Sequence, residues 1–226
     1  MVGPSIAENL ESVREKIRAA CSRVNRPAIE VKLIAVSKGQ SVRKIQEALK
    51  HEQNLFGENY VQEAIEKQHE VTGAHWHFIG QLQSNKAKQV VGNFALIHSV
   101  DRESLVREIS RRAIEKKIVQ DILLEVSLTG EKTKGGVSVS AFGELIALAR
   151  ELPGIRVRGL MGMPPAGTPE QSRPLFRMMK LMLEKWPAKD FTELSMGTSQ
   201  DFEVAVEEGA TLVRVGTDVF GPRELE

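Results

Sequence analysis

The stretch VKLIAVSK, residues 31–38, decides how the chain is expected to fold. Apolar residues, several of them branched, fill most of it. A run this short and this apolar is typical of a strand buried on both faces, as in a parallel sheet. Gly39 ends the run, and Ser41 suits the N-cap of a following helix. Lys38 therefore stands at the carboxyl end of a buried strand, where α/β folds place their chemistry.

The same alternation of strand and helix runs through the rest of the chain. Seven more strands are expected at residues 54–57, 75–80, 94–100, 121–128, 155–161, 191–196 and 211–216. Helices are expected at residues 5–24, from 41 onward, and at 60–71, 84–91, 102–117, 140–152, 169–186 and 200–208. Eight repeats predict an α/β fold: a closed (β/α)8 TIM barrel with an extra N-terminal helix.

An open, doubly wound sheet is the alternative fold. It is disfavoured because no G-x-G-x-x-G follows the first strand. No linker or shift in composition divides the chain, so we expect a single domain over residues 1–226.

Composition excludes several classes of function. The chain has 226 residues, 41% of them hydrophobic and 27% charged, and its net charge of +1 gives no field that calls for nucleic acid or an anionic membrane. No apolar run approaches the roughly 18 residues of a membrane span. A single cysteine, Cys21, cannot form an internal disulfide and favours a reducing cytosol. We therefore expect a cytoplasmic protein.

The strand ends collect one amine, several amides and hydroxyls, and one guanidinium. Lys38 is the amine, and a lysine in apolar surroundings can attack carbonyl groups. The ordinary alternative is a surface lysine that has left the sheet. His75 and His77 share one predicted strand, the other three histidines are dispersed, and none has a partner at metal-ligand spacing, so no metal site is expected.

The ends of the last two strands suggest a phosphate site. SMGTS (195–199) leads into a helix expected to open near Thr198 or Ser199, and VGT (215–217) follows the last strand. Glycines, hydroxyls and a helix start all suit an anion, and the loops after strands seven and eight are the usual phosphate site of such barrels. The alternative is helix capping alone, by Thr198 and Asp201.

A lysine opposite a phosphate site indicates one of two Schiff-base chemistries. One is an aldolase acting on a phosphorylated sugar, and the other is pyridoxal 5′-phosphate held as an aldimine. Arg214 alternates with Leu212 and Gly216 on one face of the last strand, so it can reach a ligand at the mouth of the barrel. The alternative interpretation is that Arg214 is a surface residue whose guanidinium lies among helix ends.

Long motifs make the chain similar to a known family. VSK ends at Lys38, and the others are FGENYVQE (56–63), HFIGQLQSNK (77–86), GEKTKGG (130–136), GLMGMP (159–164) and LSMGTSQDFEVAVEEGATLVRVGTDVFGPR (194–223). Together they resemble the pyridoxal-phosphate homeostasis protein family, whose fold is similar to the barrel domain of alanine racemase (fold type III). Thr198 departs from the family pattern MGMS, where methionine is expected, and adds a hydroxyl.

The resemblance implies how the cofactor, pyridoxal 5′-phosphate, would be held. Lys38 would carry it as a Schiff base. The phosphate would be held by Ser195, Thr198, Gly216 and Thr217.

The resemblance also implies the groups around the ring. Arg214 would face the pyridine nitrogen, and Asn59 and Met161 would lie near the ring. Family members are regarded as regulators of vitamin B6 and amino-acid pools rather than enzymes of known reaction.

The chemistry of Arg214 agrees with a role outside catalysis. A guanidinium donates hydrogen bonds but accepts none, so it leaves the pyridine nitrogen unprotonated and weakens the cofactor as an electron sink. A racemase also needs a second base, and Tyr60 is the only tyrosine. We expect no dedicated catalytic residue, although slow side chemistry remains open.

Three functions stay open from the sequence. The first is a non-catalytic protein, expected to be a monomer, that buffers pyridoxal phosphate or delivers it to apoenzymes. The second is a small pyridoxal-phosphate-dependent amino-acid racemase or a Schiff-base aldolase. The third is a signalling adaptor in which the cofactor acts as a conformational sensor.

Overall fold

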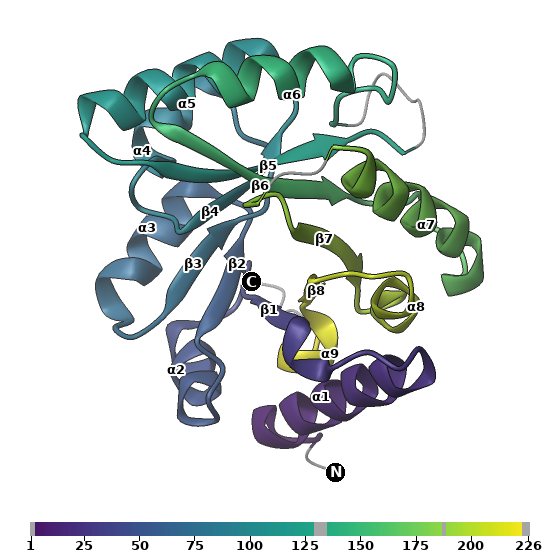
Figure 1. The fold of residues 1–226 in the computed structure, drawn as a ribbon. Coiled ribbons are helices and arrows are strands. Elements are labelled where there is room, and N and C mark those ends of the chain that lie inside the picture. Colours follow the sequence, from purple (N-terminus) through teal and green to yellow (C-terminus); the bar gives the residue numbers. More distant parts are fainter. Residues whose placement is uncertain (1–2, 129–134, 187–188, 223–226) are drawn as a thin grey trace.

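The computed structural model describes residues 3–128, 135–186 and 189–222 and shows a closed barrel (Figure 1). In this described part, parallel strands follow one another in chain order, and the last pairs with the first. The strands are β1 Lys32–Val36, β2 Leu55–Glu58, β3 His75–Phe78, β4 Leu96–Val100, β5 Gln120–Val126, β6 Ile155–Gly162, β7 Glu193–Thr198 and β8 Leu212–Val215. The predicted TIM barrel is confirmed, and the open sheet is excluded.

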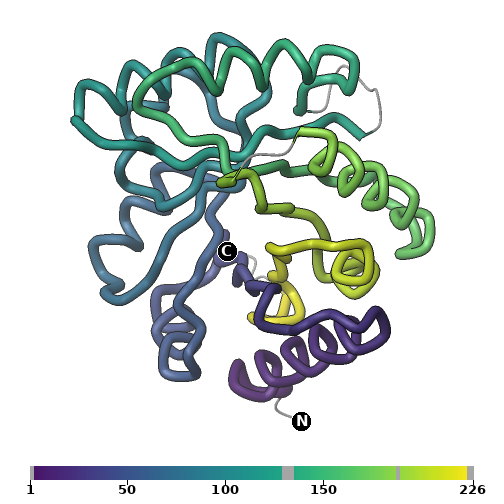
Figure 2. The backbone as a smooth tube through the Cα atoms, in the orientation of Figure 1, coloured from purple at the N-terminus to yellow at the C-terminus, as the bar shows by residue number. Residues whose placement is uncertain are grey.

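Helices surround the strands on the outside (Figures 1 and 2). The α-helices are α1 Ile6–Arg23, α2 Val42–Lys50, α3 Val61–Glu70, α4 Ala87–Val90, α5 Glu103–Glu115, α6 Phe142–Glu151, α7 Pro169–Lys185, α8 Phe202–Glu207 and α9 Thr217–Phe220. Among the described residues there are also two short 3-10 helices, η1 Ala28–Glu30 and η2 Ser84–Lys86. Most of the motif GEKTKGG (130–136) falls on residues 130–134, outside the described residues.

The N-terminal helix α1 completes the outer layer. Ser5 caps it through a capping box with Glu8, in which the Glu8 backbone N–H donates to the Ser5 hydroxyl and the Glu8 carboxylate accepts from the Ser5 backbone N–H. Leu10, Val13 and Ile17 form its buried face. The helix packs against α2, α8 and α9. Because α9 is only one turn long, α1 covers the part of the barrel that a longer last helix would otherwise cover.

Two layers of apolar side chains build the core. The larger layer lies between strands and helices, and a small one fills the barrel with Ile34, Leu96, Leu123, Met161 and Leu212. Successive strand residues point to opposite faces, so the residues two positions beyond this inner layer also face the barrel interior, nearer its mouth. Those positions include Val36, His98, Glu125 and Arg214. The inner apolar layer therefore lies directly below polar groups.

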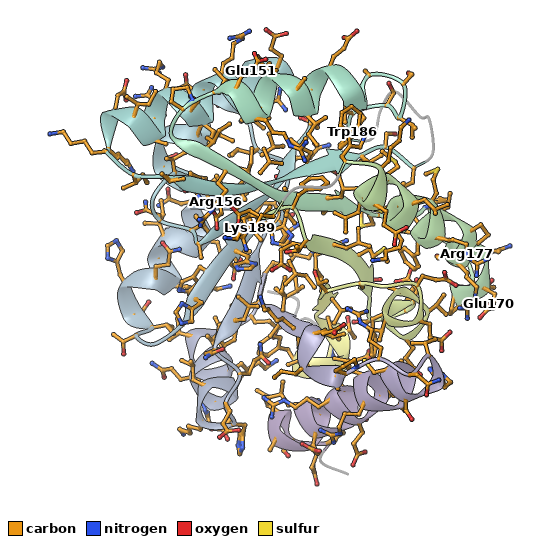
Figure 3. The ribbon with its side chains drawn as sticks, in the orientation of Figure 1. Glu151, Arg156, Glu170, Arg177, Trp186 and Lys189 are labelled. Atoms are coloured by element: carbon orange, nitrogen blue, oxygen red, sulfur yellow. The ribbon has the colours of Figure 1, made fainter. Side chains whose placement is uncertain are left out.

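Charged side chains point outward from the helical layer, as Glu151 of α6 and Glu170 and Arg177 of α7 show in Figure 3. Within the part of the chain that the structure describes, no helix is both long and apolar enough to cross a lipid bilayer.

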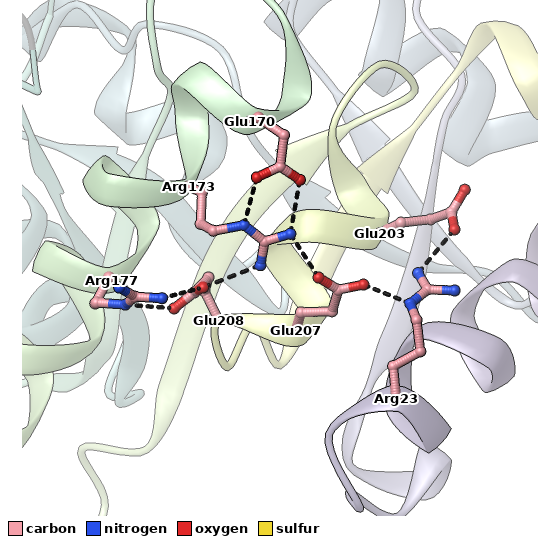
Figure 4. A network of polar contacts seen from close by, with 7 residues as sticks. All are labelled: Arg23, Glu170, Arg173, Arg177, Glu203, Glu207 and Glu208. Carbon is pink, nitrogen blue, oxygen red and sulfur yellow. Dashed lines mark hydrogen bonds and ion pairs between the residues drawn. The ribbon is translucent and has the colours of Figure 1, made fainter.

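A network of ion pairs joins α1, α7 and α8 (Figure 4). The Arg173 guanidinium donates to Glu170 at 2.7 Å, to Glu207 at 2.7 Å and to Glu208 at 3.1 Å. Glu207 also accepts from Arg23 of α1 at 2.6 Å. Burial alone would raise the pKa of the Glu207 carboxyl, but the hydrogen bonds from Arg173 and Arg23 outweigh it and lower that pKa. One carboxylate thus links the first helix to the last third of the barrel.

Replacing Arg173 with alanine should destabilise the fold measurably. Single exposed ion pairs contribute little, but this guanidinium is only about a quarter exposed and serves three carboxylates. We expect a loss of about 1–2 kcal/mol in the free energy of unfolding, between the exposed and buried limits. Urea unfolding at 0.1 M and 1 M salt measures it, and screening should shrink the difference at high salt.

Arg107→Ala is the matched control for this prediction. Arg107 makes one exposed pair with Glu103 on the same helix, which is worth about 0.2–0.5 kcal/mol. Equal losses in the two variants would show that the network adds nothing beyond isolated pairs.

Candidate functional site

A cavity of about 770 Å³ opens at the carboxyl ends of the strands. Side chains and backbone from most of the strands line it. Its polar and sulfur-bearing lining includes Lys38, Asn59, Gln81, Glu125, Met161, Thr198, Ser199, Asp201, Arg214, Gly216 and Thr217. Among the predicted site residues that the structure describes, Ser195 alone is absent from this lining.

Lys38 lies in the turn that follows β1, two residues beyond the end of the strand. The residues on both sides of it are held by neighbouring elements. The Ser37 backbone N–H donates to Gly57 of β2 at 3.0 Å, and the Gly39 N–H donates to the Glu63 carboxylate of α3 at 2.6 Å. The turn that carries Lys38 is therefore fixed from two sides.

A buried ion pair supports the same turn from below. Glu58, at the end of β2, accepts from the Ser37 hydroxyl at 2.6 Å and from the Lys67 ammonium at 2.8 Å. Lys67 also donates to the Ser37 carbonyl at 2.6 Å and to Glu63 at 2.6 Å. Burial raises the pKa of Glu58 despite these partners. Sequence reasoning noted FGENYVQE without this role, although a glutamate that ends an apolar strand was a usable signal.

The turn after β7 differs from the predicted one. Thr198 donates to the Asp201 carboxylate through its backbone N–H at 2.7 Å and through its hydroxyl at 3.1 Å. Asp201 is the N-cap of α8, which begins at Phe202 and has six residues. The expected helix start near Ser199 is therefore wrong. The interaction between Thr198 and Asp201 is present. It is the contact on which the alternative of helix capping without a phosphate site was based.

Ser199, Gly216 and Thr217 form the adjoining wall. The Gly216 N–H donates to the Ser199 hydroxyl oxygen at 3.3 Å. A side chain at Gly216 would stand 3.4 Å from the Val36 carbonyl, so β8 passes close to β1 here. The hydroxyls of Ser199 and Thr217 can donate to an anion in the cavity. Sequence reasoning quoted Ser199 within SMGTS but did not select it.

Arg214 reaches the cavity from a buried position on β8. Its guanidinium donates to the Ser195 hydroxyl at 2.6 Å and to the Gly162 carbonyl at 3.1 Å. Burial lowers the pKa of Arg214 to about 10, and the Glu125 and Asp201 carboxylates oppose that shift. The side chain therefore stays charged at neutral pH. The alternative of a surface guanidinium is wrong, since Arg214 is 6% exposed.

A line of hydrogen bonds continues from Arg214 into the barrel. Ser195 Oγ lies 2.9 Å from His98 Nδ1, and His98 Nε2 lies 3.0 Å from His77 Nδ1. Burial lowers the pKa of His77 to about 3 and that of His98 well below its usual value, so both rings are neutral near pH 7. Ser195 accepts from Arg214 and therefore satisfies its own proton by donating to His98 Nδ1. His98 then donates from Nε2 to His77.

Ser195 consequently occupies a different place from the one expected. It is fully buried beneath Arg214 and its hydroxyl is used on both sides. The histidines also differ from expectation, because His77 and His98 meet on adjacent strands although the sequence separates them. They remain a pair, and no group of three or more metal-binding side chains occurs among the residues described.

Two buried polar atoms of the cavity have no hydrogen-bond partner within the described residues. They are Asn59 Oδ1 and Glu125 Oε2. Buried polar atoms are usually paired, so orphaned ones at a cavity indicate groups that await a ligand. Asn59 is held in place because Gly80 packs on its backbone, where a Cβ would stand 2.1 Å from the Asn59 carbonyl oxygen.

The geometry therefore offers an amine, a charged guanidinium, two hydroxyls and unpaired polar atoms around one space. An amine can bond to a carbonyl carbon, and the guanidinium and hydroxyls can bind anionic or acceptor groups. The arrangement suits a small molecule that carries both a carbonyl group and an anionic group.

Comparison with known proteins identifies similar chains. The family model for the alanine racemase N-terminal domain matches residues 8–224. A curated relative from Aquifex aeolicus (strain VF5), named pyridoxal phosphate homeostasis protein, is 44% identical over 223 residues. The match covers 96% of this chain and 98% of that relative.

Solved structures show the same fold. PipY of Synechococcus elongatus PCC7942, in a structure with PLP bound, superimposes with a TM-score of 0.84 at 39% identity. The match covers 96% of this chain and 100% of PipY. The alanine racemase of Streptomyces coelicolor A3(2) is 17% identical with a TM-score of 0.69, and the match covers 94% of this chain but 58% of the racemase. That similarity concerns the fold alone.

Proposed function

Because the chain belongs to the alanine racemase N-terminal domain family, and within it to the pyridoxal phosphate homeostasis proteins, we propose that it binds pyridoxal 5′-phosphate for vitamin B6 and amino-acid homeostasis. The observation that carries this proposal is the convergence of Lys38, Arg214 and the Ser199–Gly216–Thr217 wall on one cavity. We infer that residues 1–226 act as one pyridoxal-phosphate-binding domain.

The residues present fit this cofactor. Its aldehyde bonds covalently to a lysine amine with loss of water, and it carries a phosphate and a pyridine ring. Lys38 would supply the amine, and its turn is fixed through Ser37 and Gly39. Asn59 offers an unpaired polar atom at the same cavity, and Met161 an apolar surface for the ring.

The phosphate is proposed to lie against the end of β8. Gly216 and Thr217 offer backbone and hydroxyl groups there, and Ser199 adds a hydroxyl. Thr198 keeps its predicted place on the wall, and we propose that it contributes by holding Asp201 in place. Ser195 is proposed to support Arg214 instead of the phosphate, because its hydroxyl already bonds to Arg214 and His98.

Arg214 supports a role in binding over a dedicated reaction. A guanidinium that donates to the pyridine nitrogen leaves that nitrogen unprotonated and weakens the cofactor as an electron sink for carbanion chemistry. Tyr60, the only tyrosine, is 62% exposed and lies outside the cavity lining among the described residues. We therefore infer that racemisation, if tested, is negligible.

The proposal extends to setting and partners. We propose a cytoplasmic monomer that exchanges its cofactor with pyridoxal-phosphate-dependent apoenzymes. The exposed side chain of Met163, which lines the cavity, supports exchange of the cofactor at this end of the barrel.

A binding titration combined with a turnover assay tests the function. Purified protein should develop a visible absorbance band with pyridoxal phosphate and should show no saturable conversion of alanine or other amino acids. Light scattering should give the mass of one chain. Absence of binding would refute the cofactor role, and robust turnover would establish an enzyme instead.

The Ser195→Ala variant separates support of Arg214 from contact with phosphate. Removal of the hydroxyl leaves Arg214 and His98 without their shared partner, so we expect a loss of about 1–3 kcal/mol in the free energy of unfolding. Affinity for pyridoxal phosphate should fall about tenfold, or ~1.4 kcal/mol, because Arg214 is no longer oriented. The preference for pyridoxal phosphate over pyridoxal should not change.

Ser110→Ala is the matched control. Ser110 is 3% exposed and donates to the Pro153 carbonyl at 2.7 Å, on the outer side of the barrel. The Ser110→Ala variant should lose a similar amount of the free energy of unfolding, and its affinity for pyridoxal phosphate should not change. A reduced preference for the phosphate ester in Ser195→Ala would instead restore Ser195 as a phosphate ligand.

A further inference from the structure

Glu125 is a carboxyl group inside the barrel that the proposed function has not used. It belongs to β5, pairs in register with Met161 of β6, and stands two residues beyond Leu123 of the inner apolar layer. By strand alternation it faces the barrel interior near the mouth, and it lines the cavity. A glutamate at such a position must interact with whatever occupies that space.

The surroundings of the carboxyl are closely packed. Its Oε2 is buried and makes no hydrogen bond with any residue that the structure describes. Gly135 packs against it, since a Cβ there would stand 3.3 Å from both carboxyl oxygens and 2.7 Å from the Gln81 amide nitrogen. One oxygen is thus held out of water with no partner among the described residues, which is costly for a charged carboxylate.

Several charges act on Glu125. The pKa of this carboxyl is raised to about 7: burial is the largest cause, Asp101 beyond β4 adds to it, and Arg214 from β8 opposes both. Lys38 and Asp201 line the same cavity. Near neutral pH the group therefore exists in both forms, and only the neutral form has a proton to donate.

We propose that Glu125 contacts bound pyridoxal phosphate as a neutral acid and takes up a proton when the cofactor binds at alkaline pH. This inference rests on the proposed function. The ligand carries negative charge and displaces water from the cavity, and both effects favour the uncharged carboxyl. The carboxyl group then gains a partner by donating its proton to an acceptor on the ligand.

The consequence is an affinity that falls with pH for a reason specific to Glu125. Below pH 7 the carboxyl is already neutral and binding needs no proton. Above pH 7 the Glu125 carboxylate must take up one proton for each cofactor molecule that binds. With a group that titrates near 7, the wild-type affinity relative to a neutral variant should be unchanged at pH 6 and about tenfold weaker at pH 8.

The test compares wild type with Glu125→Gln, which keeps the shape and removes the titration. Dissociation constants for pyridoxal phosphate are measured by absorbance titration at pH 6, 7 and 8. At each pH, the dissociation constant of wild type is divided by that of the variant. This ratio removes every pH dependence that the two proteins have in common. Glu103→Gln, the same change on the exposed face of α5, is the matched control and should follow wild type.

Calorimetry in two buffers of different ionisation enthalpy gives a second readout. At pH 8 wild type should take up close to one more proton per bound cofactor than Glu125→Gln. Asp101→Asn removes a charge that raises the pKa of Glu125, so Glu125 should lose its proton at lower pH in this variant. The affinity of the variant for pyridoxal phosphate should therefore begin to fall at lower pH than that of wild type. This arm keeps the inference testable if Glu125→Gln does not fold.

The outcomes separate the inference from the function on which it rests. Parallel pH profiles and equal proton uptake in wild type and Glu125→Gln, or a profile unmoved by Asp101→Asn, would overturn the role of Glu125 and leave cofactor binding intact. No binding by wild type at any pH would overturn the proposed function itself.

Discussion

Replacing Lys38 with alanine should remove the visible absorbance band that pyridoxal phosphate gives with the wild-type protein. The covalent bond needs an amine at this position, and the variant supplies none. Borohydride reduction of wild type should fix the cofactor to the peptide that contains Lys38, and reduction of the variant should fix none. The fold should survive, because Lys38 lies in a turn beyond β1 and contributes little to either apolar layer.

Lys32→Ala provides the matched control on the same strand. Lys32 begins β1 at the opposite end of the barrel, is largely exposed, and pairs with Glu193 at 3.3 Å. Its removal should leave the absorbance band and the labelled peptide unchanged. A reduced peptide that maps to another lysine in wild type would refute the assignment of Lys38.

The second large effect concerns the phosphate of the cofactor. Pyridoxal, which lacks it, should bind about 10²- to 10⁴-fold more weakly than pyridoxal phosphate. This estimate takes two hydrogen bonds to a charged group at about 1.5–3 kcal/mol each. Ser199 and Thr217 are the donors we expect to matter, because both hydroxyls line the cavity.

Single variants divide this effect between the two hydroxyl donors. Ser199→Ala and Thr217→Val should each reduce the preference for pyridoxal phosphate over pyridoxal about tenfold, or ~1.4 kcal/mol, when both ligands are titrated under the same conditions. Ser195→Ala should not reduce it. Equal affinity of wild type for the two ligands would mean that the ends of β7 and β8 serve only as turn and helix caps.

The barrel could be predicted from the sequence because its determinants are local. Short apolar runs alternate with amphipathic helices, and each strand begins and ends within two residues of its predicted bounds. Lys38 was selected for the same reason, since an apolar strand followed by lysine and glycine can be read from nine residues, 31–39.

The places of Ser195 and Thr198 depend on pairing between strands, which the sequence does not display. Ser195 pairs with Leu212 and Thr198 with Arg214, so three steps along β7 match two along β8. Gly197, with φ of +89°, absorbs the extra residue. The irregularity puts Ser195 one layer below Arg214 and Thr198 level with it. A regular strand would have given a different assignment.

Glu125 and the histidine pair were missed for related reasons. Glu125 lies inside the apolar run DILLEVSL, residues 121–128, and not at its end, so a search for polar residues at strand ends passes over it. His77 and His98 come from β3 and β4, and they meet only once the barrel fixes the stagger of those strands. A charged residue inside an apolar strand was the available signal for Glu125.

The pairing of β8 with β1 determines when during biosynthesis a binding site can exist. Lys32 of β1 pairs with Leu212 of β8, so the last strand to leave the ribosome must find the first. Such long-range contacts form slowly and late. Lys38 follows β1, whereas Arg214, Gly216 and Thr217 come with β8. A nascent chain therefore exposes the lysine long before it has the groups that we propose retain the cofactor, and on this proposal loading must follow translation.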